Sequence, residues 1–368
     1  MIWAIVCKKT DYICASKTER MKIVMDEKIP FLQDVLSEMG FTVKALPGAS
    51  ITNGDVEDAI ALFVRTRTEC SKELLEGTSV RFIGTATIGH DHVDAGYCAS
   101  KGIEWCNAAG CNAGAVLQYV QSVIYGWARD NSAVLDGMVL GVVGVGEIGS
   151  RVAHWARSVG MMVLLNDPQR EAQGEAGFVS IEEIADSCDI ITFHPSLVMG
   201  GEFPSFHLAD AAFFASLMRC RLLINASRGP VFDNVALLDA LNSGLSCDVV
   251  LDVWENEPFI DFSLLKKVYL GTPHIAGYSA EGKANATRMV LEAFVSFVKY
   301  KGRVPQITLP PPAGVRVVAA SFPDALLRIY SPLSDSNALK SSPSSFEELR
   351  NNYRLRRETG AYEIVIEG

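Results

Sequence analysis

The chain has 368 residues, which is more than one domain usually holds, so we expect two or three domains. Its net charge is −10, from 33 basic and 43 acidic residues, and such an acidic balance argues against nucleic acid as a partner. No apolar run approaches the ~18–20 residues of a membrane span, and the nine cysteines include no C-x-x-C pair, which is typical of reduced thiols in the cytoplasm.

Residues 1–20 differ in character from the rest of the chain. Their apolar run is only about six residues long, too short for the core of a secretion signal, and no basic segment precedes it. A cleaner beginning lies at Met21, in "MKIVMDEKIP". We interpret residues 1–20 as a dispensable extension or a misplaced start.

The first block after Met21 alternates strand-like and helix-like patterns. A helical pattern lies at 31–39. Apolar runs typical of buried strands lie at 21–26, 41–46, 59–66, 80–89 and 102–107. This alternation predicts a parallel sheet with helices packed on it. We expect a substrate domain made of residues 21–112 with a return at 275–300.

A second block follows a helical pattern at 112–130, which is long enough to cross between domains. An apolar run ends in the glycine-rich stretch "GVVGVGEIGS" at 141–150. Further strand-like runs lie at 161–167, 188–194, 221–227, 247–253 and 268–274. Helical stretches lie between them, a rhythm typical of a doubly wound sheet, so we expect a dinucleotide-binding domain at 113–274.

The end of the chain forms a smaller unit at 301–368. A helical pattern at 281–300 is followed by "QITLPPPAG" at 306–314, which three successive prolines exclude from a helix interior. We expect an α+β unit with one strand, two short helical segments and a closing strand, and we interpret the serine-rich "SDSNALKSSPSS" as a loop. A unit this small should pack against the rest of the chain or a second subunit.

The glycine-rich loop fits a dinucleotide site. Gly144 permits the tight turn, Gly146 lets a pyrophosphate approach the backbone, and Gly149 lets helix and strand pack closely. A carboxylate at Asp167, 18 residues after Gly149, favours NAD over NADP because it accepts from the ribose 2′-hydroxyl. A tight turn without a ligand, and an ordinary strand end before Pro168, remain the alternatives. The expected loop contacts are Gly144, Gly146, Glu147, Ile148 and Gly149.

Three ionisable residues follow predicted strands of the second block. Arg228 follows "LLINAS", Glu257 follows "VVLDVWEN" and His274 follows "VYLGTP". The carboxyl ends of parallel strands line the ligand crevice, so these side chains should converge. Arginine suits a carboxylate, histidine takes a hydroxyl proton, and a glutamate beside it orients the ring. Taken alone, each of these residues would more often belong to a surface ion pair than to a catalytic site. His90 and His92 lack a third ligand, so we expect no metal.

The stretches "GVVGVGEIG", "INASRGPVFDN", "LDVWENEP" and "PHIAG" resemble the D-isomer-specific 2-hydroxyacid dehydrogenases over about residues 21–300. The resemblance implies two doubly wound parallel-sheet domains, one flavodoxin-like for substrate and one Rossmann domain for NAD. It implies that Arg228 binds the substrate carboxylate, that Glu257 partners His274, and that His274 is the acid/base. Asp252 would lie beside the nicotinamide.

Further stretches, among them "VRTRT", "GTATIGHDHVD", "HIAGYSAEGKA" and "FEELRNNYRLRRE", resemble one subgroup of that family. The likeness implies a C-terminal unit that forms a homodimer and a small anionic, phosphorylated hydroxy acid as substrate. It implies substrate contacts from Thr66, Thr87 and Tyr278. It implies cofactor contacts from Asp167, Ala226, Ser227 and Gly277.

The chain departs from the family at two places. Pro195 stands where members commonly have a threonine that contacts the cofactor, and Ser196 is the residue that could replace it. Gln118 precedes Tyr119 where members have glutamate.

A phosphorylated substrate needs local cations, because the acidic chain repels anions at long range. Arg65 and Arg67, which flank Thr66, are candidates for the phosphate, although a solvated strand-end pair is the alternative. The basic run Arg354, Arg356 and Arg357 fits a helix face or a subunit contact better. Two other functions remain open: a phosphoglycerate or other 2-hydroxyacid dehydrogenase, and an NAD-sensing binding protein on the same fold.

Overall fold

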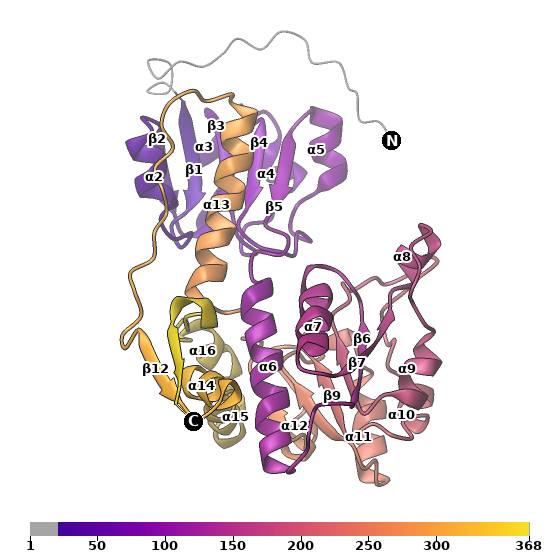
Figure 1. Ribbon diagram of the computed structural model, residues 1–368. Coiled ribbons are helices and arrows are strands. Elements are labelled where there is room, and N and C mark those ends of the chain that lie inside the picture. Colours follow the sequence, from indigo (N-terminus) through magenta and orange to yellow (C-terminus); the bar gives the residue numbers. More distant parts are fainter. Residues whose placement is uncertain (1–20, 368) are drawn as a thin grey trace. The chain divides into compact units, whose positions relative to one another are not determined.

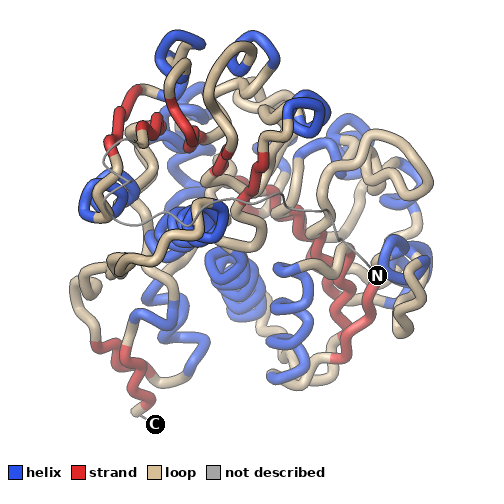
Figure 2. The backbone as a smooth tube through the Cα atoms, turned by 90° about the horizontal axis from the view of Figure 1, so that it is seen from above, coloured by secondary structure: helices blue, strands red, loops and turns tan. Residues whose placement is uncertain are grey.

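The computed structural model describes residues 21–367, so the interpretation of residues 1–20 lies outside the described residues. The described chain forms two compact units. Unit 1 contains the residues up to Asn112 together with Ala280–Pro310, and unit 2 contains Ala113–Ser279 and the residues from Pro311 onward. In each unit helices flank the strands (Figure 2). No helix within residues 21–367 has the length and apolarity to cross a membrane.

Unit 1 is built on a five-stranded parallel sheet with the order β2-β1-β3-β4-β5 (Figure 1). Its strands are β1 (Lys22–Asp26), β2 (Thr42–Leu46), β3 (Ala59–Val64), β4 (Phe82–Thr85) and β5 (Glu104–Asn107). Its helices are α2 (Leu32–Glu38), α3 (Asn53–Val56), α4 (Lys72–Leu75), α5 (Ala95–Lys101) and α13 (Ala280–Phe297), with a 3-10 turn η1 (Gly48–Ser50). The strands alternate side chains between two apolar clusters, one on each face of the sheet.

Helix α13 covers one face of this sheet (Figure 1) and brings Phe294 into an aromatic cluster. The ring of Phe294 lies 5.4 Å from that of Phe63 and 5.5 Å from that of Phe82. Gly84 in β4 makes this packing possible, because a Cβ atom there would lie 2.8 Å from the Phe63 ring and 3.1 Å from Val290. The return of the chain at residue 280 therefore completes the core of unit 1.

Unit 2 contains a six-stranded parallel sheet with the order β11-β10-β9-β8-β6-β7. Its strands are β6 (Val139–Val143), β7 (Met162–Asn166), β8 (Ile190–Phe193), β9 (Leu222–Asn225), β10 (Asp248–Leu251) and β11 (Leu270–Gly271). Its helices are α6 (Ala113–Asp130), α7 (Glu147–Ser158), α8 (Pro168–Ala172), α9 (Ile181–Ser187), α10 (Ala211–Ala215), α11 (Asn234–Asn242) and α12 (Phe262–Lys267), with a 3-10 turn η2 (Gly229–Val231). From β6 the chain first adds β7 on one side and then adds β8 to β11 on the other side. Doubly wound sheets bind ligands at this switch in strand order.

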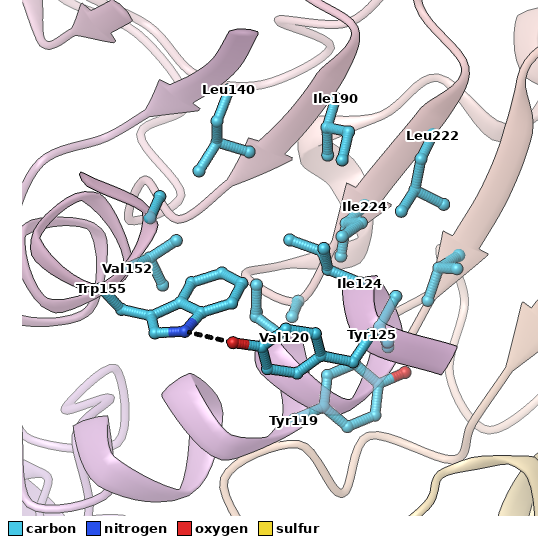
Figure 3. Close-up of a cluster of buried hydrophobic side chains, with 14 of the residues drawn as sticks. Tyr119, Val120, Ile124, Tyr125, Leu140, Val152, Trp155, Ile190, Leu222 and Ile224 are labelled. Atoms are coloured by element: carbon cyan, nitrogen blue, oxygen red, sulfur yellow. Dashed lines mark hydrogen bonds between the residues drawn. The ribbon is translucent and has the colours of Figure 1, made fainter. Parts of the chain in front are cut away.

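Both faces of this sheet are buried. In β6, Leu140 and Val142 join one apolar cluster and Val139 and Val143 join the other. Figure 3 shows the first cluster, in which α6 packs its apolar side chains against the strands and the indole nitrogen of Trp155 donates to the Tyr125 hydroxyl at 3.3 Å. This two-sided burial explains the near-continuous apolar runs of the sequence.

The C-terminal residues from Pro311 onward belong to unit 2 and form a small α+β group. It contains two parallel strands, β12 (Arg316–Ala319) and β13 (Glu363–Ile366), the helices α14 (Phe322–Ile329), α15 (Leu333–Ser341) and α16 (Phe346–Asn351), and the 3-10 turns η3 (Pro343–Ser345) and η4 (Thr359–Ala361).

Three helices lie where we expected two, and the expectation of a loop at "SDSNALKSSPSS" is wrong, because α15 covers most of it. Tertiary contacts hold this polar helix against the sheet. Leu339 is fully buried, the Ser336 hydroxyl accepts from the Gly271 amide at 3.0 Å, and the Lys340 ammonium donates to the carbonyl of Val268 at 2.6 Å. Such contacts override the weak helix propensity of serine.

Candidate active site

The three expected catalytic residues follow three adjacent strands of unit 2. Arg228 follows β9, Glu257 follows β10 and His274 follows β11, and these strands are neighbours in the sheet. The strands are parallel, so all three residues lie beyond the same edge.

Glu257 and His274 are in direct contact. The ring nitrogen Nδ1 of His274 donates to Oε2 of Glu257 at 2.8 Å, and Oε1 of Glu257 accepts from the Trp254 amide at 2.9 Å. Burial works to raise the pKa of Glu257, but the hydrogen bond and charge of His274 and the Trp254 amide outweigh it, so the pKa is lowered from its usual value. The ionised carboxylate can only accept, which places the proton on Nδ1 and leaves Nε2 with a lone pair.

The backbone at His274 is held by Asp252. His274 has a left-handed φ of 57°, and its amide donates to the Asp252 carbonyl at 2.7 Å. The carboxylate of Asp252 accepts from the Thr272 hydroxyl at 2.7 Å and from the amides of Ile275 at 2.8 Å and Ala276 at 2.9 Å. The Asp252 side chain is fully buried by these groups. Asp252 therefore shapes the turn that carries His274.

Arg228 is presented by a turn that Asn225 stabilises. The buried amide of Asn225 donates to the Arg228 carbonyl at 3.1 Å and accepts from the Ser227 hydroxyl at 2.8 Å. The half-buried Arg228 guanidinium donates through Nη1 to the Ser227 carbonyl at 2.8 Å. No further hydrogen bond to it is present among residues 21–367, so its remaining donors can bind an anion.

The glycine-rich loop has the geometry of a phosphate-binding turn. Gly144 has a φ of 84°, and a Cβ atom there would lie 2.5 Å from the nitrogen of Pro195. At Gly149 a Cβ atom would lie 2.1 Å from the Gly144 carbonyl oxygen, so only glycine lets α7 approach the loop. At Gly146, the N-cap of α7, there is open space within 4 Å. Backbone donors of the helix start are therefore accessible to an anion.

A cavity of about 570 Å³ opens beside this loop. Its lining includes Gly144, Gly146, Asp167, His194, Pro195 and Ser196. Asp167 accepts from the Val145 amide at 2.9 Å, which ties the acidic strand end to the loop. Burial lowers the pKa of His194, so its ring is neutral. The open backbone at Gly146, the carboxylate and the cavity together fit NAD, for which Gly144, Gly146, Asp167 and Ser196 are the residues able to hold it.

The other expected cofactor residues lie at the start of α7 and in the turns beside Arg228 and His274. Glu147 and Ile148 form the first turn of α7 and do not line the cavity. Ala226 and Ser227 are buried in the turn before Arg228, and Gly277 is half-buried in the turn after His274.

Four expected substrate residues lie in unit 1. Thr66 and Arg67 are exposed. Arg65 forms two hydrogen bonds with the carboxylate of Asp26, at 2.9 and 3.3 Å, and Asp26 is fully buried. Thr87 is half-buried, and its hydroxyl donates to the Gly89 carbonyl at 2.8 Å. The charge of Arg65 is thus largely committed to Asp26.

The basic run near the C-terminus does not form a helix face, which was one of the two placements that we expected for it. Helix α16 ends at Asn351, so Arg354, Arg356 and Arg357 form no helix face. Arg356 is buried, with 9% exposure, and donates to the carbonyls of Ala115, Ile275, Ala276 and Tyr278. It also donates to Oε1 of Gln118 at 3.0 Å, while the Gln118 amide group donates to the Arg357 carbonyl. The glutamine that departs from the family pattern therefore supplies a donor that glutamate lacks.

Tyr278, the remaining expected substrate residue, meets a residue that we did not anticipate. Its hydroxyl accepts from Nε of Arg350 at 3.2 Å. Sequence reasoning also missed Asn225 and Thr272. The only sign of them in the sequence was a polar residue at the end of an apolar strand run. Polar residues are common at such positions, so this pattern could not identify Asn225 and Thr272 as functional.

Comparison with known proteins agrees with this geometry. A family model described as "D-isomer specific 2-hydroxyacid dehydrogenase, NAD binding domain" matches residues 115–276. The erythronate-4-phosphate dehydrogenase of Bacteroides thetaiotaomicron is 49% identical over 346 residues, which cover 94% of this chain and 99% of that protein. That of Cronobacter sakazakii is 42% identical, with 92% of each chain covered.

Among solved structures, the fold is similar to that of NAD⁺-bound 3-phosphoglycerate dehydrogenase from Entamoeba histolytica. The TM-score is 0.63 at 22% identity, over 76% of this chain and 95% of that one. The chain therefore belongs to the D-isomer-specific 2-hydroxyacid dehydrogenases, a family of NAD-dependent oxidoreductases, and within it to the group of the erythronate-4-phosphate dehydrogenases.

Proposed function

We propose that the protein oxidises the C2 hydroxyl of 4-phospho-D-erythronate with NAD, giving 2-oxo-3-hydroxy-4-phosphobutanoate, a step in the synthesis of pyridoxal 5′-phosphate. The observation that carries the proposal is the 2.8 Å contact between His274 and Glu257 at the carboxyl edge of the sheet that also presents Arg228. The names of the similar enzymes support the choice of substrate.

In this proposal each side chain has one task. Nε2 of His274 accepts the proton of the C2 hydroxyl, because Nδ1 already donates to Glu257. The Glu257 carboxylate stabilises the imidazolium that results. The free donors of Arg228 hold the substrate carboxylate and polarise C2. Bound NAD supplies the acceptor for the hydride that leaves C2.

Cofactor preference offers a first prediction. We propose that Asp167 accepts from the ribose hydroxyls of NAD and repels the 2′-phosphate of NADP. Asp167→Asn keeps an acceptor for the Val145 amide but removes the charge, so the preference for NAD should fall on the order of tenfold. Fluorescence titration with NADH and NADPH measures both dissociation constants. An unchanged ratio of the two dissociation constants would show that Asp167 only stabilises the glycine-rich loop and does not select the cofactor.

The phosphate of the substrate gives a second prediction. We propose Arg65 and Arg67 for this group, with Thr66, Thr87 and Tyr278 as further substrate contacts. Arg67→Ala should raise KM roughly tenfold for 4-phosphoerythronate and change the KM for unphosphorylated erythronate much less, because the proposed substrate contact is with the phosphate.

Arg65 needs a different substitution. Alanine at this position would leave the buried Asp26 carboxylate without a counter-charge, at a cost of about 3–5 kcal/mol in stability. Arg65→Lys keeps the charge and tests the geometry alone. If neither the Arg67→Ala nor the Arg65→Lys variant changes KM, the phosphate is held elsewhere.

The function itself is tested by adding 4-phosphoerythronate to the protein with NAD and following nicotinamide reduction by absorbance. Saturable reduction that is faster than with 3-phosphoglycerate supports the proposal. Faster turnover of 3-phosphoglycerate or another 2-hydroxy acid would reassign the substrate. Binding of NAD without turnover of any of these acids would favour a sensor role.

The proposal includes a cytoplasmic homodimer that forms through the C-terminal residues. Its support is a group of exposed apolar side chains in this part of unit 2: Val315, Val318, Phe322, Leu333, Leu355 and Ile366. The seven cysteines among the described residues are free thiols, which suits a reducing compartment.

A further inference from the structure

Arg350 reaches the acid/base pair from the C-terminal part of the chain. Its Nη1 lies 3.6 Å from Oε2 of Glu257, the same oxygen that accepts from Nδ1 of His274. Its Nε donates to the hydroxyl of Tyr278 at 3.2 Å. The Arg350 guanidinium therefore contacts Glu257, which precedes His274 in the sequence, and Tyr278, which follows it. Both contacts join residues that are far apart in the chain.

The position of Arg350 is fixed by the packing of α16. Phe346, one helical turn before Arg350, is 1% exposed and belongs to the apolar cluster that also contains Trp254. Leu349 packs against the same cluster. Beyond the helix, the Tyr353 ring meets the Tyr278 ring edge-on, with 6.0 Å between the centroids. Because Trp254 also donates its amide to Glu257, one core holds both the carboxylate and the helix that faces it.

The charges around the pair define what Arg350 can do. The groups facing Glu257 are His274 and Arg350, with the hydroxyl of Tyr278 and the buried carboxylate of Asp252 close to Arg350. Burial works to lower the pKa of Arg350, but Tyr278, Glu257 and Asp252 outweigh it and raise the pKa. Arg350 thus stays charged beside the Glu257 carboxylate, which also accepts a hydrogen bond from His274.

We propose that Arg350 is a positioning residue of the active site, which holds Glu257 and Tyr278 in place so that the C-terminal segment takes part in the acid/base step. The inference rests on the proposed function in that His274 and Glu257 form the acid/base pair. It goes beyond that function by giving residues 346–358 a role in turnover, in addition to any role in subunit contact.

The test compares Arg350→Gln and Arg350→Lys with Arg354→Gln, an exposed arginine on the same segment for which residues 21–367 show no ion pair or hydrogen bond. Arg350→Gln should lower kcat at least about tenfold with a smaller change in KM, because a misplaced acid/base group slows the reaction more than binding. Arg350→Lys should recover part of this loss, because the charge beside Glu257 returns. Arg354→Gln should match the parent protein.

The pH profile separates positioning from simple structural support. Oxidation needs the neutral His274 ring, and removal of a nearby cation favours the protonated ring. The acid limb of the kcat profile of Arg350→Gln should therefore move to higher pH. Histidine-ring NMR titration of the substrate-free protein, with His274→Gln to assign the signal, should show the same direction.

Two outcomes would overturn the inference. In the first, Arg350→Gln matches Arg354→Gln in both kcat and titration midpoint. In the second, kcat falls together with the melting temperature, lysine restores nothing, and the titration midpoint is unchanged. The NMR measurement uses no substrate, so it decides the role of Arg350 even if the parent protein fails to oxidise 4-phosphoerythronate and the proposed function is rejected.

Discussion

Replacing His274 by glutamine is expected to lower turnover ~10²-fold or more while NAD binding is retained. The amide of glutamine can still donate to Glu257, so the turn after β11 keeps its main side-chain contact. What is lost is the lone pair of Nε2, the atom that we propose takes the hydroxyl proton. Single-turnover kinetics by absorbance, together with fluorescence titration of NADH, measures the two quantities separately.

A matched control for this variant lies on α7. His154 is exposed, and within the described part of the chain no hydrogen bond or ion pair reaches its ring. His154→Gln should therefore leave turnover unchanged. Near-normal turnover in His274→Gln would remove His274 from its proposed role, whereas equal losses in both variants would point to a general loss of the folded protein.

Arg356→Met is expected to produce a large loss of stability. Methionine keeps much of the side-chain volume but leaves the carbonyls of Ala115, Ile275 and Tyr278 without their buried donor. Unsatisfied buried groups cost about 1–3 kcal/mol each, so the free energy of unfolding should fall by about 3 kcal/mol or more. For a unit of this size the melting temperature should fall by roughly 6–12 °C. Differential scanning calorimetry measures this change.

The same variant should also lose activity, because Arg356 holds the backbone directly after His274. Arg354→Met, an exposed substitution two residues earlier, is the matched control and should melt within about 1 °C of the parent protein. An equally small shift in Arg356→Met would mean that water satisfies these carbonyls as well as the guanidinium does.

The sequence was sufficient wherever a local pattern implied a backbone geometry. The turn at Gly144 follows from glycine between an apolar strand and an amphipathic helix, and its φ of 84° is one that other residues rarely adopt. The two parallel sheets follow from apolar runs alternating with helices. The pairing of Glu257 with His274 needed one further step, the rule that ligands bind at the carboxyl edge of such sheets.

Features that depend on contacts between distant residues could not be predicted in this way. Helix α15 has a serine-rich sequence, and its reason for being helical is the docking of Leu339 and Ser336. Arg350 and Arg356 lie in one basic stretch with similar neighbours, yet one faces Glu257 and the other is buried among carbonyls. Only the fold of the C-terminal residues distinguishes their surroundings.

These long separations have a consequence for how the protein is made. Arg356 bonds to Ala115, 241 residues earlier, and to Ile275, 81 residues earlier. A ribosome therefore finishes the whole Rossmann sheet well before the arginine that secures the turn after His274 emerges. Until then a nascent chain has its glycine-rich loop but not this support, so affinity for dinucleotide should arise earlier in biosynthesis than the capacity to turn over substrate.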